Sequence, residues 1–167
     1  MAGVEVEVGP GAEATRELNI GFFSRMSRGT PWVRLKAAAS LDGRTALENG
    51  TSQWITSAPA RTDVHALRAT VDAIIAGVGT VLADDPQLTV RDLRDGTPAI
   101  KQPLRVVVDS HGRTPETARV NDAAATTWIV TAAEVGAGPD GRVDLNALLT
   151  ALFGRGIRSV LLEGGPT

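Results

Sequence analysis

The stretch Ala73-Ile-Ile-Ala-Gly-Val-Gly79 decides the fold class of this chain. Its first four residues are apolar, and a short apolar run bounded by glycine is typical of a strand that is buried on both faces. The glycines predict a tight turn with positive φ, and a short helix should follow until Asp85-Pro86 ends it. A buried strand that passes through a turn into a helix is a unit of a parallel sheet.

The same alternation of strand and helix continues on both sides of this stretch. Before it, Val33, Leu35, Ala37 and Ala39 alternate with polar residues as in a strand. Further strands are expected at Leu104–Val108, Thr127–Val130 and Ser159–Leu162, and an amphipathic helix at Leu145–Phe153. Short apolar strands separated by helices predict an α/β fold whose sheet is covered on both faces.

A second helix is predicted after Ser57, which can cap it, with Pro59 in the first turn. The residues at helical spacing that should form its buried stripe are Ala60, Val64, Leu67 and Val71. A different face carries Arg61, His65 and Arg68.

The first 30 residues have a different character. Val4-Glu-Val-Glu-Val8 alternates as a short strand would, and Gly9-Pro-Gly11 interrupts it. Glu13 to Met26 is expected to form one helix, whose apolar side is Leu18, Phe22, Phe23 and Met26.

Composition excludes several classes of function. The chain has 167 residues, 43% of them hydrophobic and 22% charged, which is ordinary for one globular domain. A net charge of −2 argues against a nucleic-acid partner. Cysteine is absent, which excludes disulfides and thiolate metal sites and fits a cytoplasmic protein. No apolar run approaches the roughly 20 residues that span a membrane. His65 and His111 lack partners at ligand spacing, so no metal site is expected.

Polar residues and glycines gather where the predicted strands end, which is where a parallel sheet places its ligand site. Lys36 lies on the first of the predicted strands, and Glu163 follows Val160-Leu-Leu162. Arg68 and Arg91 could together balance much of the charge of a phosphomonoester. Simpler explanations exist for several of these polar residues: Lys36 could be an edge lysine that reaches solvent, Arg68 a solvated helix residue, and Ser110, which follows the strand at Leu104–Val108, a turn residue.

Six segments in this order resemble a known family: Lys36–Thr45, Ser52–Thr56, Asp63–Ala69, Thr80–Pro86, Leu88–Arg91 and Leu162–Thr167. Over roughly Leu18 to Thr167 the chain is similar to the reductase domain of the bifunctional riboflavin-biosynthesis deaminase/reductase. The resemblance implies a dihydrofolate-reductase-like, mixed but mainly parallel sheet with flanking helices. It also implies reduction of 5-amino-6-(5-phosphoribosylamino)uracil to the ribitylamino product by NADPH.

The resemblance also implies roles for particular residues. The candidate catalytic groups that would assist opening of the ribose are Lys36 and Glu163, and this assignment rests on their charges and on their predicted positions at the same edge of the sheet. The implied substrate-binding residues are Ser52, Arg68, Leu88, Arg91 and Glu163. The implied NADPH-binding residues are Ala38, Trp54, Thr80, Asp84, Ser110, Gly165, Pro166 and Thr167.

The same resemblance divides the chain into three parts. Residues 1–17 would be the tail of a preceding deaminase domain, residues 18–30 a linker helix, and residues 31–167 a reductase domain that lacks its C-terminal part. Without cysteine the chain cannot form a zinc deaminase site of the Pro-Cys-x-x-Cys type. A homodimer is implied for the complete protein. Two alternatives stay open, namely another dihydrofolate-reductase-like enzyme and a fragment without turnover.

Overall fold

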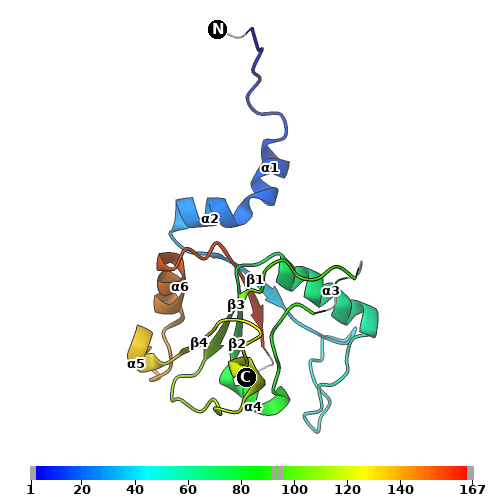
Figure 1. Ribbon diagram of the computed structural model, residues 1–167, viewed down its shortest axis with the longest axis vertical. Coiled ribbons are helices and arrows are strands. Elements are labelled where there is room, and N and C mark those ends of the chain that lie inside the picture. The colour runs from blue at the N-terminus through cyan, green and yellow to red at the C-terminus, as the bar shows by residue number, and fades with distance from the viewer. Residues whose placement is uncertain (1–2, 92, 94–95, 165–167) are drawn as a thin grey trace.

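A five-stranded sheet with helices on both faces forms the body of the molecule in the computed structural model, which describes residues 3–91, 93 and 96–164 (Figure 1). The elements are α1 (Ala12–Leu18), α2 (Ile20–Arg28), β1 (Trp32–Lys36), α3 (Ala58–Ala69), β2 (Ala73–Gly77), α4 (Val78–Asp84), β3 (Leu104–Val108), the 3-10 turn η1 (Arg119–Asn121), β4 (Thr127–Val130), α5 (Ala132–Val135), α6 (Leu145–Gly154) and β5 (Ser159–Glu163).

The strand order is β1-β5-β2-β3-β4, and all four ladders are parallel. The last strand of the described chain therefore lies between the first two, with Lys36 of β1 opposite Glu163 of β5. Among the described residues the antiparallel pairing is limited to an isolated bridge between Ala137 and Val143. The predicted α/β class with flanking helices is confirmed.

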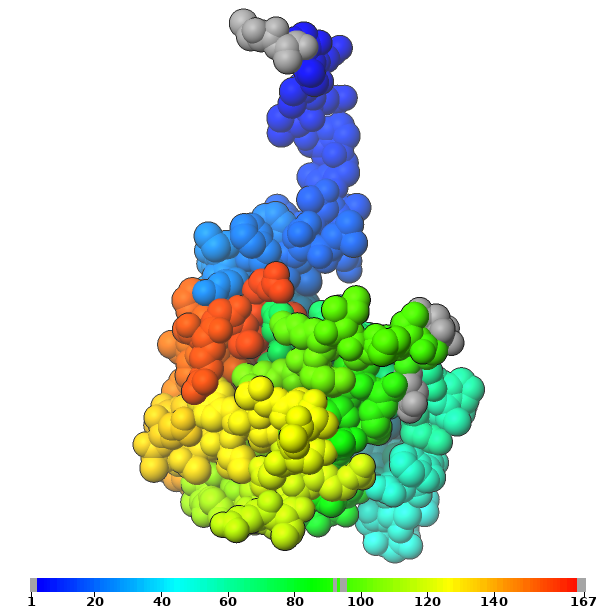
Figure 2. Space-filling model, viewed as in Figure 1, coloured from blue at the N-terminus to red at the C-terminus, as the bar shows by residue number. Residues whose placement is uncertain are grey.

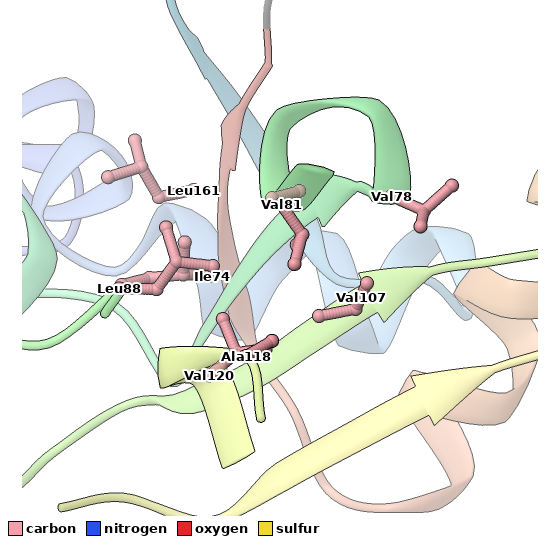
Figure 3. Packing of buried hydrophobic residues seen from close by; sticks show 9 residues of the cluster. Ile74, Val78, Val81, Leu88, Val107, Ala118, Val120 and Leu161 are labelled. Atoms are coloured by element: carbon pink, nitrogen blue, oxygen red, sulfur yellow. The ribbon is translucent and has the colours of Figure 1, made fainter. Parts of the chain in front are cut away.

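One hydrophobic cluster fills the space between the sheet and the helices α3 and α4 (Figure 3). The sheet contributes Ile74, Val107 and Leu161, and α4 contributes Val78 and Val81. Leu88, from the segment that follows α4, is buried in the same cluster. This packing fixes that segment against the face of the sheet on which α3 lies.

A second cluster covers the opposite face of the sheet. Leu148 and Leu152 of α6 pack there against Ile75, Val106 and Val160. Val33 and Leu35 of the edge strand β1 point to the same side, because their register partners are Val160 and Leu162, but both are exposed.

Helix α3 begins as the sequence predicts. The Ser57 side chain accepts a hydrogen bond from the backbone N–H of Ala60 at 3.4 Å, and a proline lies in the first turn. The most buried residue of α3 is His65, while Val64 and Leu67 of the predicted stripe are half-buried.

One local prediction was wrong, and a second was confirmed in part. Gly77 has φ −79°, because it ends β2 in extended geometry and directly precedes α4, so no left-handed turn is needed there. The predicted helix from Glu13 to Met26 is divided at Asn19 into α1 and α2. Its apolar side chains remain exposed, and Figure 2 shows this N-terminal segment extending from the body.

The predicted strand at Val4–Val8 is also absent. The described residues of this stretch have no regular secondary structure, and all three valines are exposed. A strand needs a neighbour to satisfy its backbone groups, and none lies beside this segment in the described chain.

Candidate active site

The carboxyl ends of all five strands lie at one edge of the sheet, because every ladder is parallel. Lys36 ends β1, Glu163 ends β5, and Gly77 ends β2 just before α4. Ser110 follows β3 by two residues. The structure thus brings to one edge the groups that sequence analysis assigned to separate strand ends.

Lys36 and Glu163 are neighbours across the β1–β5 ladder. Residues directly opposite each other in a sheet project to the same face, and Glu163 faces α3. Lys36 therefore projects toward α3 as well. It is half-buried and forms no hydrogen bond or ion pair with any residue that the structure describes.

Glu163 forms a bidentate ion pair with Arg68 of α3. Arg68 Nε donates to Oε1 at 2.6 Å, and Nη2 donates to Oε2 at 2.9 Å. The two side chains are only 11% and 9% exposed. Arg68 Nη1 also donates to the carbonyl of Thr89 at 2.9 Å. Arg68 thus links α3, β5 and the segment that contains Thr89. A residue that only bound a phosphate would not need these contacts.

Arg91 lies on the segment that Arg68 reaches. Its Nη1 donates to Thr89 Oγ1 at 3.2 Å and to Gln87 Oε1 at 3.3 Å. Leu88, three residues earlier, is buried and has φ 51°, a left-handed value that branched residues rarely adopt. The structure therefore places Leu88 and Arg91 on one tightly held segment beside Arg68.

The loop between β1 and α3 carries two more predicted residues. Trp54 is 71% exposed, and the guanidinium of Arg61 lies 4.4 Å from the centre of its ring. Gln53, next to it, donates to Asp84 Oδ1 at 2.7 Å. This hydrogen bond joins the loop to α4 and so brings the predicted residues Trp54 and Asp84 into one region. Ser52 is exposed on the same loop.

Three further predicted cofactor residues lie near the ends of strands or at the start of a helix. Thr80 is half-buried in the first turns of α4, and Ala38 is half-buried just after β1. Ser110 accepts a hydrogen bond from the backbone N–H of Val143 at 3.0 Å, which ties the end of β3 to the segment before α6. Gly165, Pro166 and Thr167 lie outside the described residues.

Arg105 is a buried cation that sequence analysis missed. It lies in β3, is fully buried, and donates from Nη1 to Asp122 Oδ1 at 2.7 Å and to the carbonyl of Gln87 at 3.2 Å. The hydrogen bond from Arg105, with another from Gln87, lowers the pKa of Asp122 to about 2. An arginine inside the apolar run Leu104-Arg-Val-Val-Val108 was the available signal, because a buried charge needs a partner.

Among the residues that the structure describes, no group of three or more His, Asp or Glu side chains could hold a metal ion. The described helices are all too short or too polar to cross a membrane. The chain is therefore an α/β domain with cationic and acidic side chains at the carboxyl ends of its strands.

Comparison with known proteins gives the family. The model of the RibD C-terminal domain matches residues 31–167, and the chain belongs to this family. The riboflavin biosynthesis protein RibD of Bacillus amyloliquefaciens is 44% identical over 98% of the chain and 47% of its own length. RibD of Escherichia coli K12 is 40% identical over 100% of the chain and 51% of its own length. The chain thus spans about half the length of these curated relatives.

Solved structures agree with this assignment. RibD of Acinetobacter baumannii has a TM-score of 0.82 and 40% identity over 98% of the chain and 48% of its own. A diaminohydroxyphosphoribosylaminopyrimidine deaminase/5-amino-6-(5-phosphoribosylamino)uracil reductase of Thermotoga maritima has a TM-score of 0.76 and 35% identity, over 92% of the chain and 44% of its own.

Proposed function

We propose that this chain is the reductase part of a riboflavin-biosynthesis enzyme and reduces 5-amino-6-(5-phosphoribosylamino)uracil to 5-amino-6-(5-phosphoribitylamino)uracil. The observation that carries the proposal is the family match over residues 31–167, together with the side chains at the strand ends. The name of the Thermotoga maritima relative includes the same reductase activity.

The charges at the strand ends suit a phosphorylated sugar. Lys36 and Arg68 carry two positive charges against the one negative charge of Glu163, and Arg91 lies on the neighbouring segment. An arginine presents several N–H donors to a phosphate, so Arg68 and Arg91 are the proposed phosphate residues. Arg68 has five N–H donors, of which the contacts above use three, so a phosphate can bind without breaking the pair with Glu163.

The reduction requires that the ribosylamine open before C1 accepts a hydride. We assign to Lys36 the donation of a proton toward the ring oxygen, because its ammonium group lies at the strand end without another partner among the described residues. Glu163, held by Arg68 in a fixed orientation, would accept hydrogen bonds from the sugar hydroxyls. Ser52, which is exposed on the loop between β1 and α3, would also contact the substrate.

A nucleotide cofactor is implied by the family, and we propose NADPH, which supplies the hydride. The described residues fit such a group, because the exposed indole of Trp54 offers a flat face with a cation stacked against it. Asp84 would accept from hydroxyl or amide groups of the cofactor, and Gln53 holds its carboxylate in place. Thr80, Ala38 and Ser110 would complete the contacts on this side, with residues 165–167.

The proposal extends to the organisation of the protein. We assign residues 1–17 to the tail of a deaminase domain, 18–30 to a linker, and 31–167 to the reductase domain, because the family model starts at residue 31. A homodimer and a cytoplasmic location, where a phosphorylated substrate and NADPH are retained, belong to the same proposal. Neither nucleic acid nor a membrane is a proposed partner.

Steady-state kinetics test the proposed reaction. The natural full-length polypeptide should oxidise NADPH, followed by absorbance, only when the phosphoribosylamino substrate is present. Dihydrofolate serves as the comparison substrate and should give no oxidation above background. Oxidation with dihydrofolate but not with the phosphoribosylamino substrate would replace the proposal with that of a different reductase.

A further inference from the structure

Residues 87–91, which we call the grip segment, form neither helix nor strand, yet the middle of the segment is buried. Leu88, Thr89 and Val90 expose only 2%, 2% and 4% of their surface. Buried backbone N–H and C=O groups require hydrogen-bond partners. Because the grip segment belongs to no helix or ladder, those partners must come from other parts of the chain.

Side chains from distant elements supply these partners. Arg68 of α3 donates to the carbonyl of Thr89 at 2.9 Å. Arg105 of β3 donates to the carbonyl of Gln87 at 3.2 Å. His65 Nδ1 accepts from the backbone N–H of Arg91 at 3.3 Å. The segment is therefore held by the protein around it rather than by its own secondary structure.

Gln102 forms the most complete of these attachments. Its Oε1 accepts from the backbone N–H of Val90 at 2.8 Å, and its Nε2 donates to the carbonyl of Val90 at 2.9 Å. One planar amide thus binds both backbone groups of one residue, as a neighbouring strand would. Gln102 is followed by Pro103, which is fully buried directly before β3.

Val90 lies between the two residues that matter most for the proposed phosphate contact. Thr89, before it, receives the hydrogen bond from Arg68, and Arg91, after it, is one of the proposed phosphate residues. We propose that Gln102 is a positioning residue, which holds the grip segment so that Arg68 and Arg91 meet the substrate phosphate together. This inference rests on the proposed function and adds a residue that does not itself contact the substrate.

The inference predicts a selective kinetic effect. Without the amide of Gln102, the segment has more freedom, and ordering it costs free energy each time a phosphorylated substrate binds. Lys36 and Glu163 lie on β1 and β5, and the amide of Gln102 forms its hydrogen bonds with Val90 instead, so the chemical step should be unaffected. Binding of NADPH at Trp54 and Asp84 should also be unaffected, because the amide of Gln102 forms its hydrogen bonds with Val90.

The test is a comparison of Gln102→Met with Asn121→Leu in the natural full-length polypeptide. Gln102→Met keeps the length of the side chain but removes both hydrogen bonds. Asn121→Leu removes two side-chain hydrogen bonds, to the carbonyls of Pro115 and Glu116, that do not touch the grip segment. Gln102→Met should raise KM for the phosphorylated substrate roughly tenfold, with kcat and the KM for NADPH within about twofold of wild type. Asn121→Leu should change none of them, and an unchanged substrate KM in Gln102→Met would overturn the inference.

A binding measurement separates this inference from the proposed reaction. Ribose 5-phosphate, titrated by calorimetry, should bind Gln102→Met more weakly than wild type even if neither protein turns over. If Gln102→Met binds ribose 5-phosphate more weakly and neither protein turns over, the proposed reaction is wrong but the positioning role of Gln102 is supported. Equal affinity for both proteins, or no binding to either, overturns the inference. Should Gln102→Met fail to fold, Gln102→Glu decides, since it keeps the acceptor for the Val90 N–H but places a carboxylate oxygen against the Val90 carbonyl, and it should weaken binding in the same way.

Discussion

At the residue scale, the ion pair between Arg68 and Glu163 holds two of the proposed substrate residues together. Both side chains are mostly buried, and the pair is bidentate. A buried pair adds little net stability over apolar side chains, but removal of one partner leaves an uncompensated charge. The pair is therefore better explained by what it positions, since Arg68 also holds Thr89. Retention of such a costly arrangement fits a binding site.

Glu163→Gln should destabilise the protein by about 2 kcal/mol, because Arg68 then keeps its charge but loses a charged acceptor. Denaturant unfolding measures this change. Arg142→Gln is the control, because its pair with Asp140 is exposed on both sides, and its loss should cost less than about 0.5 kcal/mol. Equal effects of the two substitutions would contradict the structural role of the pair.

Lys36→Met should lower kcat about 100-fold while affinity for NADPH stays within about twofold, because the variant loses the proposed proton donor but no cofactor contact. Stopped-flow single turnovers and NADPH titration measure the two quantities. Lys101→Met is the control, since Lys101 is exposed and pairs with Asp72 away from the strand ends. A normal kcat in Lys36→Met would assign the proton to another group.

The Asp122 carboxyl should make stability depend on pH in acid. Hydrogen bonds from Arg105 and Gln87 lower its pKa to about 2, whereas an unfolded aspartate has a pKa of about 3.9. The stabilisation is therefore complete above about pH 5 and is lost progressively as the pH falls toward 2. Thermal melting between these limits should show a smaller fall of Tm for Asp122→Asn than for wild type. Parallel curves would show that the pKa of Asp122 is not lowered.

At the scale of elements, the strands were predictable because their apolar runs need no information from elsewhere. Leu104–Val108 and Thr127–Val130 were predicted with the bounds that the structure has. The division of the N-terminal helix at Asn19 was not predicted. The apolar side chains that were expected to form its buried side are exposed in the structure. Tertiary packing, rather than local pattern, decides such segments.

Contacts between elements explain which parts of the candidate site escaped sequence analysis. Lys36 and Glu163 could be placed at strand ends from pattern alone. That Arg68 binds Glu163 depends on β5 entering the sheet beside β1, and a contact between residues 95 positions apart leaves no local signal. Gln102 and His65 looked like ordinary polar residues for the same reason.

Helix α3 carries His65 and Arg68, so its N-cap affects the site through the stability of the helix. Ser57→Ala should lower the free energy of unfolding by about 1 kcal/mol, because the Ala60 N–H loses its acceptor. Chemical denaturation measures the loss. Ser27→Ala in α2 is the control, because the Ser27 hydroxyl bonds the carbonyl of Phe23 in its own helix, and its removal should be near neutral. A neutral Ser57→Ala would show that the cap does not stabilise α3.

Across the whole molecule, the parallel ladders explain why the candidate site residues lie along one edge of the sheet. Every strand delivers its carboxyl end to that edge, and α3 covers the face toward which Lys36 and Glu163 project. Of the proposed substrate residues, Arg68 and Glu163 meet at the end of β5, whereas the proposed cofactor residues Trp54 and Asp84 come together near α4 through Gln53.

Isotopic labelling would show whether a hydride passes from NADPH to C1 of the ribosyl group, as we propose. The full-length polypeptide would be incubated with the phosphoribosylamino substrate and NADPH deuterated at C4 of the nicotinamide, using each C4 epimer in turn. If the proposed reaction is right, the ribitylamino product formed with one of the two epimers carries deuterium on C1, as mass spectrometry and NMR would show. A reduced product without deuterium on C1 from either epimer, or no reduced product at all, would contradict it.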